Sequence, residues 1–310
     1  MKFGIHNPSW LFGPDPYQIF EEVKHKAQWA ETHGFTWFSV MDHLIQIPGV
    51  GVADEPFMEG WSTLAALAAV TSRTRLSILV TSVAYRNPAH LAKIAAGVDI
   101  ISGGRLTFGI GAGWHVQEYQ QYGWVFPEKP AVRVRQMEEA IQLILTIWRE
   151  PRATFDGKYF HVKDAILEPK PVQKPHPPIM IGGSGEQLTL RAVARWGDAC
   201  NIFGDPDMVR KKFDVLRQHC ENEGRDYNSI ERTNLTALLV ARDEAGLKTK
   251  KERLQAPEPF RGLALTTTQA ADLVGRYEQV GSQMVIASSY KNDPETLELL
   301  ASDVIPHFTN

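Results

Sequence analysis

The segment Leu106-Thr107-Phe108-Gly109-Ile110-Gly111-Ala112-Gly113-Trp114 carries the strongest indication of fold in this chain. It starts as an apolar, β-branched run, which is typical of a buried strand. Alternate glycines then allow the backbone to lie close to a ligand, and a polar, helix-like run follows at residues 116–122. The segment is typical of the ligand-facing end of a strand in a sheet or barrel, although a tight turn without a ligand fits it equally well. It is not a dinucleotide fingerprint, because a tryptophan stands at position 114.

The composition is that of an ordinary globular protein. The chain has 310 residues, 43% of them hydrophobic and 22% charged, with a formal net charge of −3. Nothing in this balance indicates a nucleic-acid or membrane partner. The start of the chain lacks the apolar core of a signal peptide, and no apolar run approaches the ~18 residues of a spanning helix. The two cysteines, Cys200 and Cys220, are too few for a disulfide framework. We therefore expect a soluble, cytoplasmic protein in which Cys200 is a buried, reduced thiol.

Strand-like and helix-like segments alternate along the chain and form eight pairs. The expected strands are Phe3–His6, Phe35–Met41, Leu76–Val80, Leu106–Ile110, Ile179–Ile181, Ala199–Phe203, Asn234–Ala241 and Met284–Ala287. Such alternation favours parallel strands joined by right-handed crossovers. Eight pairs match a closed (β/α)8 TIM barrel better than an open sheet. We therefore predict an α/β fold with one barrel domain over residues 1–310.

Two stretches interrupt this alternation. At about residues 151–177, after the fourth expected helix, a hairpin turn at Phe155–Phe160 and a proline-rich run predict an insertion. The second stretch, Asp243–Thr266, is long, polar and contains prolines. It is interpreted as a mobile lid or a further insertion.

In a (β/α)8 barrel the reacting groups lie where strands end and the following loops begin. At the second strand end, the pair Asp42-His43 is suited to proton transfer, with the carboxylate orienting or tuning the imidazole; a capping pair is the alternative. At the fifth, Gly182-Gly183-Ser184-Gly185 directly precedes an expected helix, so its backbone N–H groups and the helix dipole favour a phosphate. A glycine-rich helix cap is the alternative there. A metal is not expected, because His6 and His43 stand singly, without a His-x-His pair.

Together these strand ends resemble the luciferase-like monooxygenase family of flavin- and deazaflavin-dependent oxidoreductases. The resemblance covers most of residues 1–205, through the segments Val40–His43, Leu79–Thr81, Arg86–Pro88, Ile101–Trp114, Glu118-Tyr119, Leu167–Pro171 and Pro178–Gly185. The form Gly-Ile-Gly-Ala-Gly-Trp with Glu-Tyr downstream is most similar to the branch that depends on coenzyme F420, an 8-hydroxy-5-deazaflavin.

The resemblance implies a barrel with an inserted segment, a cofactor ring at its mouth and a non-prolyl cis peptide bond in the third strand. That bond would join Leu79 to Val80, or Ile78 to Leu79 if the match slips by one residue. The implied cofactor-binding residues are His6, Leu79, Val80, Thr81, Gly111, Ala112, Gly113, Gly182, Gly183, Ser184 and Gly185. His43 matches the catalytic histidine, with Asp42 tuning it, while Trp114 and His115 would shape the substrate side.

The implied reaction is hydride transfer between F420 and a small organic substrate, which the sequence does not identify. Two alternatives remain: an FMN-dependent monooxygenase of the same fold, and a relative that binds a flavin or deazaflavin without catalysis. Bacterial luciferases carry an arginine for the phosphate where this chain has Gly111-Ala112, which weakens FMN. Lys170, Lys174, Arg191 and Arg195 would form a basic rim for an anionic cofactor tail or simply be solvated surface charges. A homodimer is expected from the resemblance alone.

Overall fold

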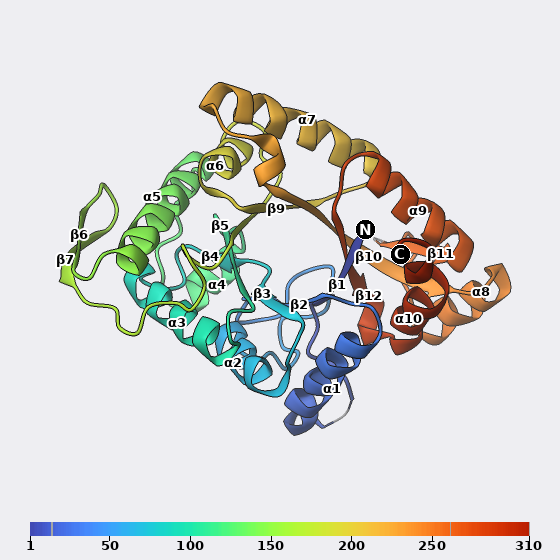
Figure 1. The fold of residues 1–310 in the computed structure, drawn as a ribbon. Coiled ribbons are helices and arrows are strands. Elements are labelled where there is room, and N and C mark those ends of the chain that lie inside the picture. Colours follow the sequence, from blue (N-terminus) through green and yellow to red (C-terminus); the bar gives the residue numbers. More distant parts are fainter. Residues whose placement is uncertain (14, 261, 310) are drawn as a thin grey trace.

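The computed structural model describes residues 1–13, 15–260 and 262–309, and these form a closed barrel of eight parallel strands. Strand β12 pairs with both β10 and β1, which closes the ring. Figure 1 shows the strands at the centre with helices around them. The predicted (β/α)8 architecture is confirmed. In ring order the strands are β1 (Lys2–Asn7), β2 (Trp37–Val40), β3 (Arg75–Ile78), β5 (Leu106–Gly111), β8 (Ile179–Gly182), β9 (Ala199–Phe203), β10 (Glu231–Ala241) and β12 (Met284–Ser289).

Helices follow the strands and bury their apolar faces against the barrel. The principal ones are α1 (Ile19–Thr32), α2 (Gly60–Val70), α3 (Pro88–Ile101), α5 (Pro130–Arg149), α6 (Thr189–Trp196), α7 (Pro206–Glu223), α9 (Thr267–Gln279) and α10 (Pro294–Leu299). Short helical turns lie at η1 (Pro16–Gln18), η2 (Tyr227–Ser229), η3 (Tyr290–Asn292), η4 (Leu300–Val304) and η5 (Ile305–His307). A short helix, α4 (Val116–Gln121), follows β5. Within the described part of the chain, no helix combines the length and the apolar character that crossing a membrane requires.

The two interruptions have different structures. The first contains an antiparallel hairpin, β6 (Ala153–Asp156) and β7 (His161–Ala165), which lies outside the barrel (Figure 1). The second is largely regular: α8 (Glu244–Arg253) begins after the side-chain cap Asp243, and β11 (Leu263–Thr266) pairs with the end of β10. Helix α8 and strand β11 are additional to the eight strand–helix pairs of the barrel, so the stretch is an insertion with regular structure.

The N-terminal end of the barrel interior is filled with side chains. Trp37, Met180, Ala199, Met284 and Ile286 form a buried cluster there, and three of them are the first residues of their strands. Gly4 makes this packing possible, because a Cβ at this position would lie 2.8 Å from Cδ1 of Trp37. The interior therefore offers space to a ligand only toward the C-terminal ends of the strands.

The third strand is interrupted where it faces the fourth. The peptide bond between Leu79 and Val80 is cis, as the resemblance implied, and the chain resumes pairing with β5 at β4 (Thr81–Ser82). The glycines of β5 accommodate this irregular backbone. A Cβ at Gly109 would overlap the carbonyl oxygen of Ile78, and one at Gly111 would lie 2.7 Å from Cγ2 of Val80. The alternate glycines are thus required by the neighbouring strand, before any ligand is considered.

Candidate active site

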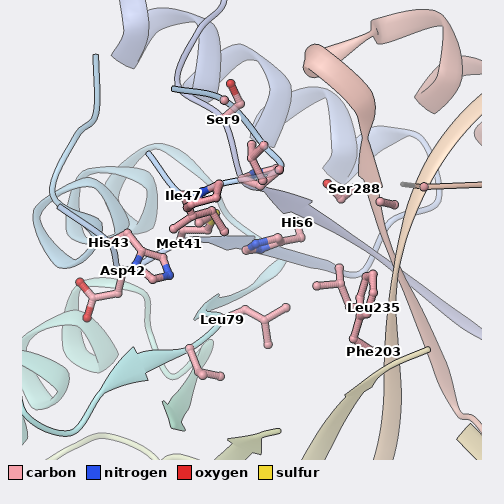
Figure 2. Close-up of a pocket in the computed structure, with 18 of the residues that line it drawn as sticks. His6, Ser9, Met41, Asp42, His43, Ile47, Leu79, Phe203, Leu235 and Ser288 are labelled. Carbon is pink, nitrogen blue, oxygen red and sulfur yellow. The ribbon is translucent and has the colours of Figure 1, made fainter. Parts of the chain in front are cut away.

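A cavity of about 1,040 Å³ opens at the C-terminal ends of the strands. Its size reaches the upper end of the range found for small-molecule sites. Figure 2 shows side chains from distant parts of the chain converging on it. Of the residues expected in the site, its lining includes His6, Asp42, His43, Leu79, Val80, Thr81, Gly111, Gly113 and Trp114. The lining does not include Ala112, His115 or the loop Gly182–Gly185.

The cavity walls are mostly apolar. Met41 and Ile47 lie near His43, whereas Phe203 and Leu235 come from β9 and β10, on the far side of the barrel from β2 (Figure 2). Pro257 and Phe260, which lie between α8 and β11 in the chain, also line the cavity. Apolar walls with a few polar groups are typical of sites that bind organic molecules.

His43 is held by a buried carboxylate that sequence analysis did not assign. Its Nδ1 lies 2.7 Å from Oε2 of Glu118, a residue of α4 that is 0% exposed. The other carboxylate oxygen accepts the backbone N–H of Leu44 at 2.5 Å, and the Tyr85 hydroxyl donates to Oε2. Burial raises the pKa of Glu118, but the hydrogen bonds from His43, Tyr85 and Leu44 outweigh it and hold the pKa below its ordinary value.

The ionised state of Glu118 fixes the proton on His43. A carboxylate only accepts hydrogen bonds, so Nδ1 of His43 carries the hydrogen that lies between the two groups. Nε2 is then the nitrogen that is available to exchange a proton. A histidine whose second nitrogen is fixed by a carboxylate is suited to general acid–base catalysis.

The hydrogen bonds of Asp42 go to groups other than His43. Its two oxygens accept a bidentate pair of bonds from Arg86, at 2.7 and 2.9 Å, and the Thr81 hydroxyl donates to it as well. Arg86 also contacts Glu59, the side-chain cap of α2. Asp42 therefore does not orient His43 through a hydrogen bond, because Arg86 binds this carboxylate and Glu118 binds the imidazole. The electrostatic tuning of His43 by Asp42 stays a prediction. Asp42 instead ties the end of β2 to the segment that precedes α3.

His6 presents a neutral imidazole ring to the cavity. Its Nδ1 lies 3.0 Å from the Ser39 hydroxyl, which donates to the carbonyl oxygen of Ile5 at 3.4 Å. Burial, followed by the charges of Lys26 and His43, lowers the pKa of His6 to about 3. Figure 2 shows the His6 ring pointing into the cavity from β1.

The two residues that follow Gly113 have different environments. Trp114 is 54% exposed at the cavity mouth, and its ring centroid lies 5.7 Å from that of His43. His115 is buried, and Nε2 of its ring has no hydrogen-bond partner in the described structure. Its ring packs beside His43 rather than facing the cavity. Of this pair, only Trp114 is among the residues that line the cavity.

The expected phosphate loop and basic rim lie outside the cavity lining. Helix α6 begins at Thr189, so it does not directly follow Gly182–Gly185 as expected. Nζ of Lys170 donates to the carbonyl oxygens of Ile147 and Glu150, at the end of α5. Arg195 pairs with Glu223 at 2.8 Å, and Lys174 donates to Pro171. The charged groups of these three residues of the predicted rim therefore bond to neighbouring parts of the protein.

The comparisons with known proteins assign the family. The model of the luciferase-like monooxygenase family matches residues 1–299. This chain belongs to that family. An uncharacterised protein of Mycobacterium tuberculosis is 32% identical over 186 residues, which cover 56% of this chain and 64% of the relative. The chain thus matches somewhat less than two thirds of that relative's length.

Two further similarities concern proteins with assigned activities. Pyrimidine monooxygenase RutA of Stutzerimonas stutzeri is 30% identical over 277 residues, covering 86% of this chain and 74% of RutA. The coenzyme F420-dependent tetrahydromethanopterin reductase of Methanopyrus kandleri has a similar structure, with a TM-score of 0.78, 18% identity and 99% of both chains covered. The latter similarity demonstrates a shared fold.

Proposed function

We propose that this luciferase-like protein is an oxidoreductase that transfers a hydride between coenzyme F420 and a small organic substrate. The single observation that carries the proposal is His43, fixed by the buried Glu118 at the edge of a cavity large enough for a ring and a substrate. Such a histidine is what a hydride transfer coupled to a proton transfer requires. F420-dependent enzymes are among the proteins that share this fold.

The residues around the third strand fit a flat ring. Leu79, Val80 and Thr81 would support one face, beside Gly111 and Gly113. A Cβ at Gly111 would lie 2.7 Å from Cγ2 of Val80, so the glycine leaves room for the Val80 side chain that forms part of this wall. Gly182, Gly183, Ser184 and Gly185 remain the proposed phosphate-binding loop, near the start of α6. The apolar lining would exclude water from the reacting groups.

A bound deazaflavin would supply or accept the hydride. His43 would hold or release the accompanying proton at Nε2, while Glu118 stabilises the imidazolium through Nδ1. Positioned proton transfer of this kind contributes roughly 10²–10⁴-fold to rate. Trp114 would cover the substrate at the cavity mouth.

An FMN-dependent monooxygenase is the second candidate, and its support is the 30% identity to pyrimidine monooxygenase RutA over most of the chain. Titrating the cofactor-free protein with F420 and with FMN, and following the quenching of cofactor fluorescence, separates the two. Tight binding of F420 with weak binding of FMN is expected. Tight FMN binding with none to F420 would overturn the first proposal in favour of the second.

Replacing His43 by Ala tests whether the protein is a catalyst or only a carrier. Turnover should be lost while cofactor binding stays within a few-fold of the wild type, because His43 is one of many lining residues. If no substrate–acceptor pair is turned over by the wild type, and binding is tight, the non-catalytic interpretation is favoured.

A further inference from the structure

One wall of the cavity consists of apolar side chains that the proposed cofactor site does not use. Phe203 of β9 is the register partner of Leu235 on β10, so the two residues are neighbours on the sheet. Ala237 comes two residues later on β10 and therefore faces the same side of the strand as Leu235. All three residues line the cavity. Figure 2 shows Phe203 and Leu235 across the cavity from Asp42 and His43.

The inserted segment adds to this wall. Pro257 and Phe260, which come between α8 and β11, contribute two further apolar side chains to the lining. The Phe260 ring meets the Tyr290 ring edge to face, with their centroids 5.0 Å apart. Phe260 also packs against a buried cluster that includes Leu239 and Leu247. These contacts fix Phe260 on the protein, so this part of the wall is formed before a ligand binds.

Phe203 leaves apolar surface uncovered inside the cavity. It is 59% exposed, and it belongs to none of the buried clusters of the described structure. A large apolar side chain that stays exposed in a concave site is typical of a place where a ligand binds. Because the core does not use this ring, its exposure points to a role in binding rather than in folding.

The charged side chains of the lining already have partners within the protein. Among the described residues that line the cavity, Asp42 pairs with Arg86, and the Lys291 ammonium donates to the carbonyl oxygen of Leu254. His6 is uncharged at neutral pH, because burial lowers its pKa to about 3. An ionised ligand group against the apolar wall would lose its hydration without gaining a counter-ion, which is costly.

We propose that Phe203, Leu235 and Phe260 form a substrate compartment for an uncharged, largely apolar organic molecule. The apolar body of the substrate packs against this wall, and its reacting end lies on the His43 side of the cavity. Phe203 and Phe260 are then residues that determine which substrates are accepted. This inference rests on the proposed function, because it assigns the substrate end of the same cavity.

Calorimetric titration of the cofactor-free protein with three probes of similar shape tests the substrate class. At neutral pH, 4-isopropylbenzyl alcohol is uncharged, 4-isopropylbenzoate is an anion and 4-isopropylbenzylamine is a cation. The alcohol should bind, and each ion should bind about tenfold more weakly or not measurably, because the wall offers it no counter-ion. Equal or tighter binding of either ion, or no binding of the alcohol, would overturn the proposal.

Variants assign the binding to this wall. Phe203→Ala should weaken the alcohol about five- to tenfold, because the probe loses apolar contact, and Phe203→Leu should restore most of the affinity. Phe203→Lys should bind 4-isopropylbenzoate more tightly than the wild type does, because it supplies the missing counter-ion. Phe260→Ala should also weaken the alcohol. Ile166→Ala is the matched control, since Ile166 is 60% exposed and outside the lining, and it should leave every affinity unchanged. Wild-type affinity for the alcohol in Phe203→Ala would contradict the assignment, and wild-type affinity in Phe260→Ala would remove the inserted segment from it.

A last arm repeats the titration of the alcohol with protein saturated by F420 or FMN, whichever binds more tightly. The alcohol should still bind the loaded protein with an affinity within a few-fold of that for the cofactor-free protein. Competitive displacement of the alcohol by the cofactor would assign this wall to the cofactor and overturn the substrate compartment. The first two arms need neither cofactor nor turnover, so their failure would reject the compartment alone. Failure of F420 to bind in the fluorescence titration would instead reject the proposed hydride transfer.

Discussion

Glu118→Gln is the substitution that probes the site most sharply, because it removes one charge and keeps the shape. The carboxylate accepts from Leu44 and Ile45 on one oxygen and from His43 and Tyr85 on the other. A glutamine offers one oxygen and one amino group. The backbone N–H groups of Leu44 and Ile45 can only donate, so the glutamine oxygen must face them. Its amino group then faces His43. We expect His43 to change tautomer, with Nδ1 accepting and Nε2 carrying the hydrogen.

The size of the effect follows from the bonds that change. Hydrogen bonds to a charged group contribute roughly 1.5–3 kcal/mol, against roughly 0.5–1.5 kcal/mol for neutral ones. Losing the charge from two or three short bonds should lower the free energy of unfolding by about 2 kcal/mol. The His43 cation loses its anionic partner, so turnover should fall by about 10- to 100-fold at unchanged cofactor affinity.

Two assays check this prediction. Long-range ¹H–¹⁵N spectra of histidine-labelled protein report which ring nitrogen of His43 carries the hydrogen, and urea unfolding reports stability. The exposed Glu22→Gln on α1 is the matched control and should change neither. If Glu118→Gln leaves the tautomer of His43 and the turnover unaltered, Glu118 does not position this histidine and our account of the site is wrong.

Two further predictions concern stability. Gly111→Ala places a Cβ 2.7 Å from Val80 and should lower the free energy of unfolding by about 1–3 kcal/mol. Gly97→Ala in α3 is the control, because its Cβ meets nothing within 4 Å and should raise the free energy of unfolding by about 0.5–1 kcal/mol. Equal urea midpoints for the two variants would refute the packing argument. Burial lowers the pKa of Lys26 from 10.5 to about 7, so between these values the unfolded chain binds more protons and wild-type stability should rise with pH. Urea unfolding from pH 7 to 9 should show a shallower rise for Lys26→Met and an unchanged one for the exposed Lys211→Met; parallel curves for all three proteins would contradict the assignment.

The sequence predicted the barrel because periodicity and glycine placement are local signals. The expected strand Ala199–Phe203 has the same bounds in the structure, and most others differ by a few residues. Helix α8 was missed because its charged sequence has no apolar stripe; Leu247 and Lys250 are its buried residues. A helix without an apolar stripe gives little of the hydrophobic periodicity by which helices are recognised in a sequence.

Within the site, the sequence predicted which residues line the cavity better than it predicted their hydrogen-bond partners. His43 and Asp42 are adjacent in the chain, which suggested a pair, yet each side chain bonds to a group from a different element. Glu118 lies 75 residues from His43, and the tertiary fold brings α4 to the loop that follows β2. The Glu118-Tyr119 motif was visible in the sequence, but nothing local indicated which residue its carboxylate holds.

A crystal structure of the protein soaked with F420 would show where the cofactor ring binds. We expect the planar ring within the cavity at the C-terminal ends of the strands, with one face against Leu79 and Val80 and with His43 at its edge. A ring bound elsewhere on the molecule, or a cavity that stays closed to the cofactor at saturating concentration, would contradict this expectation.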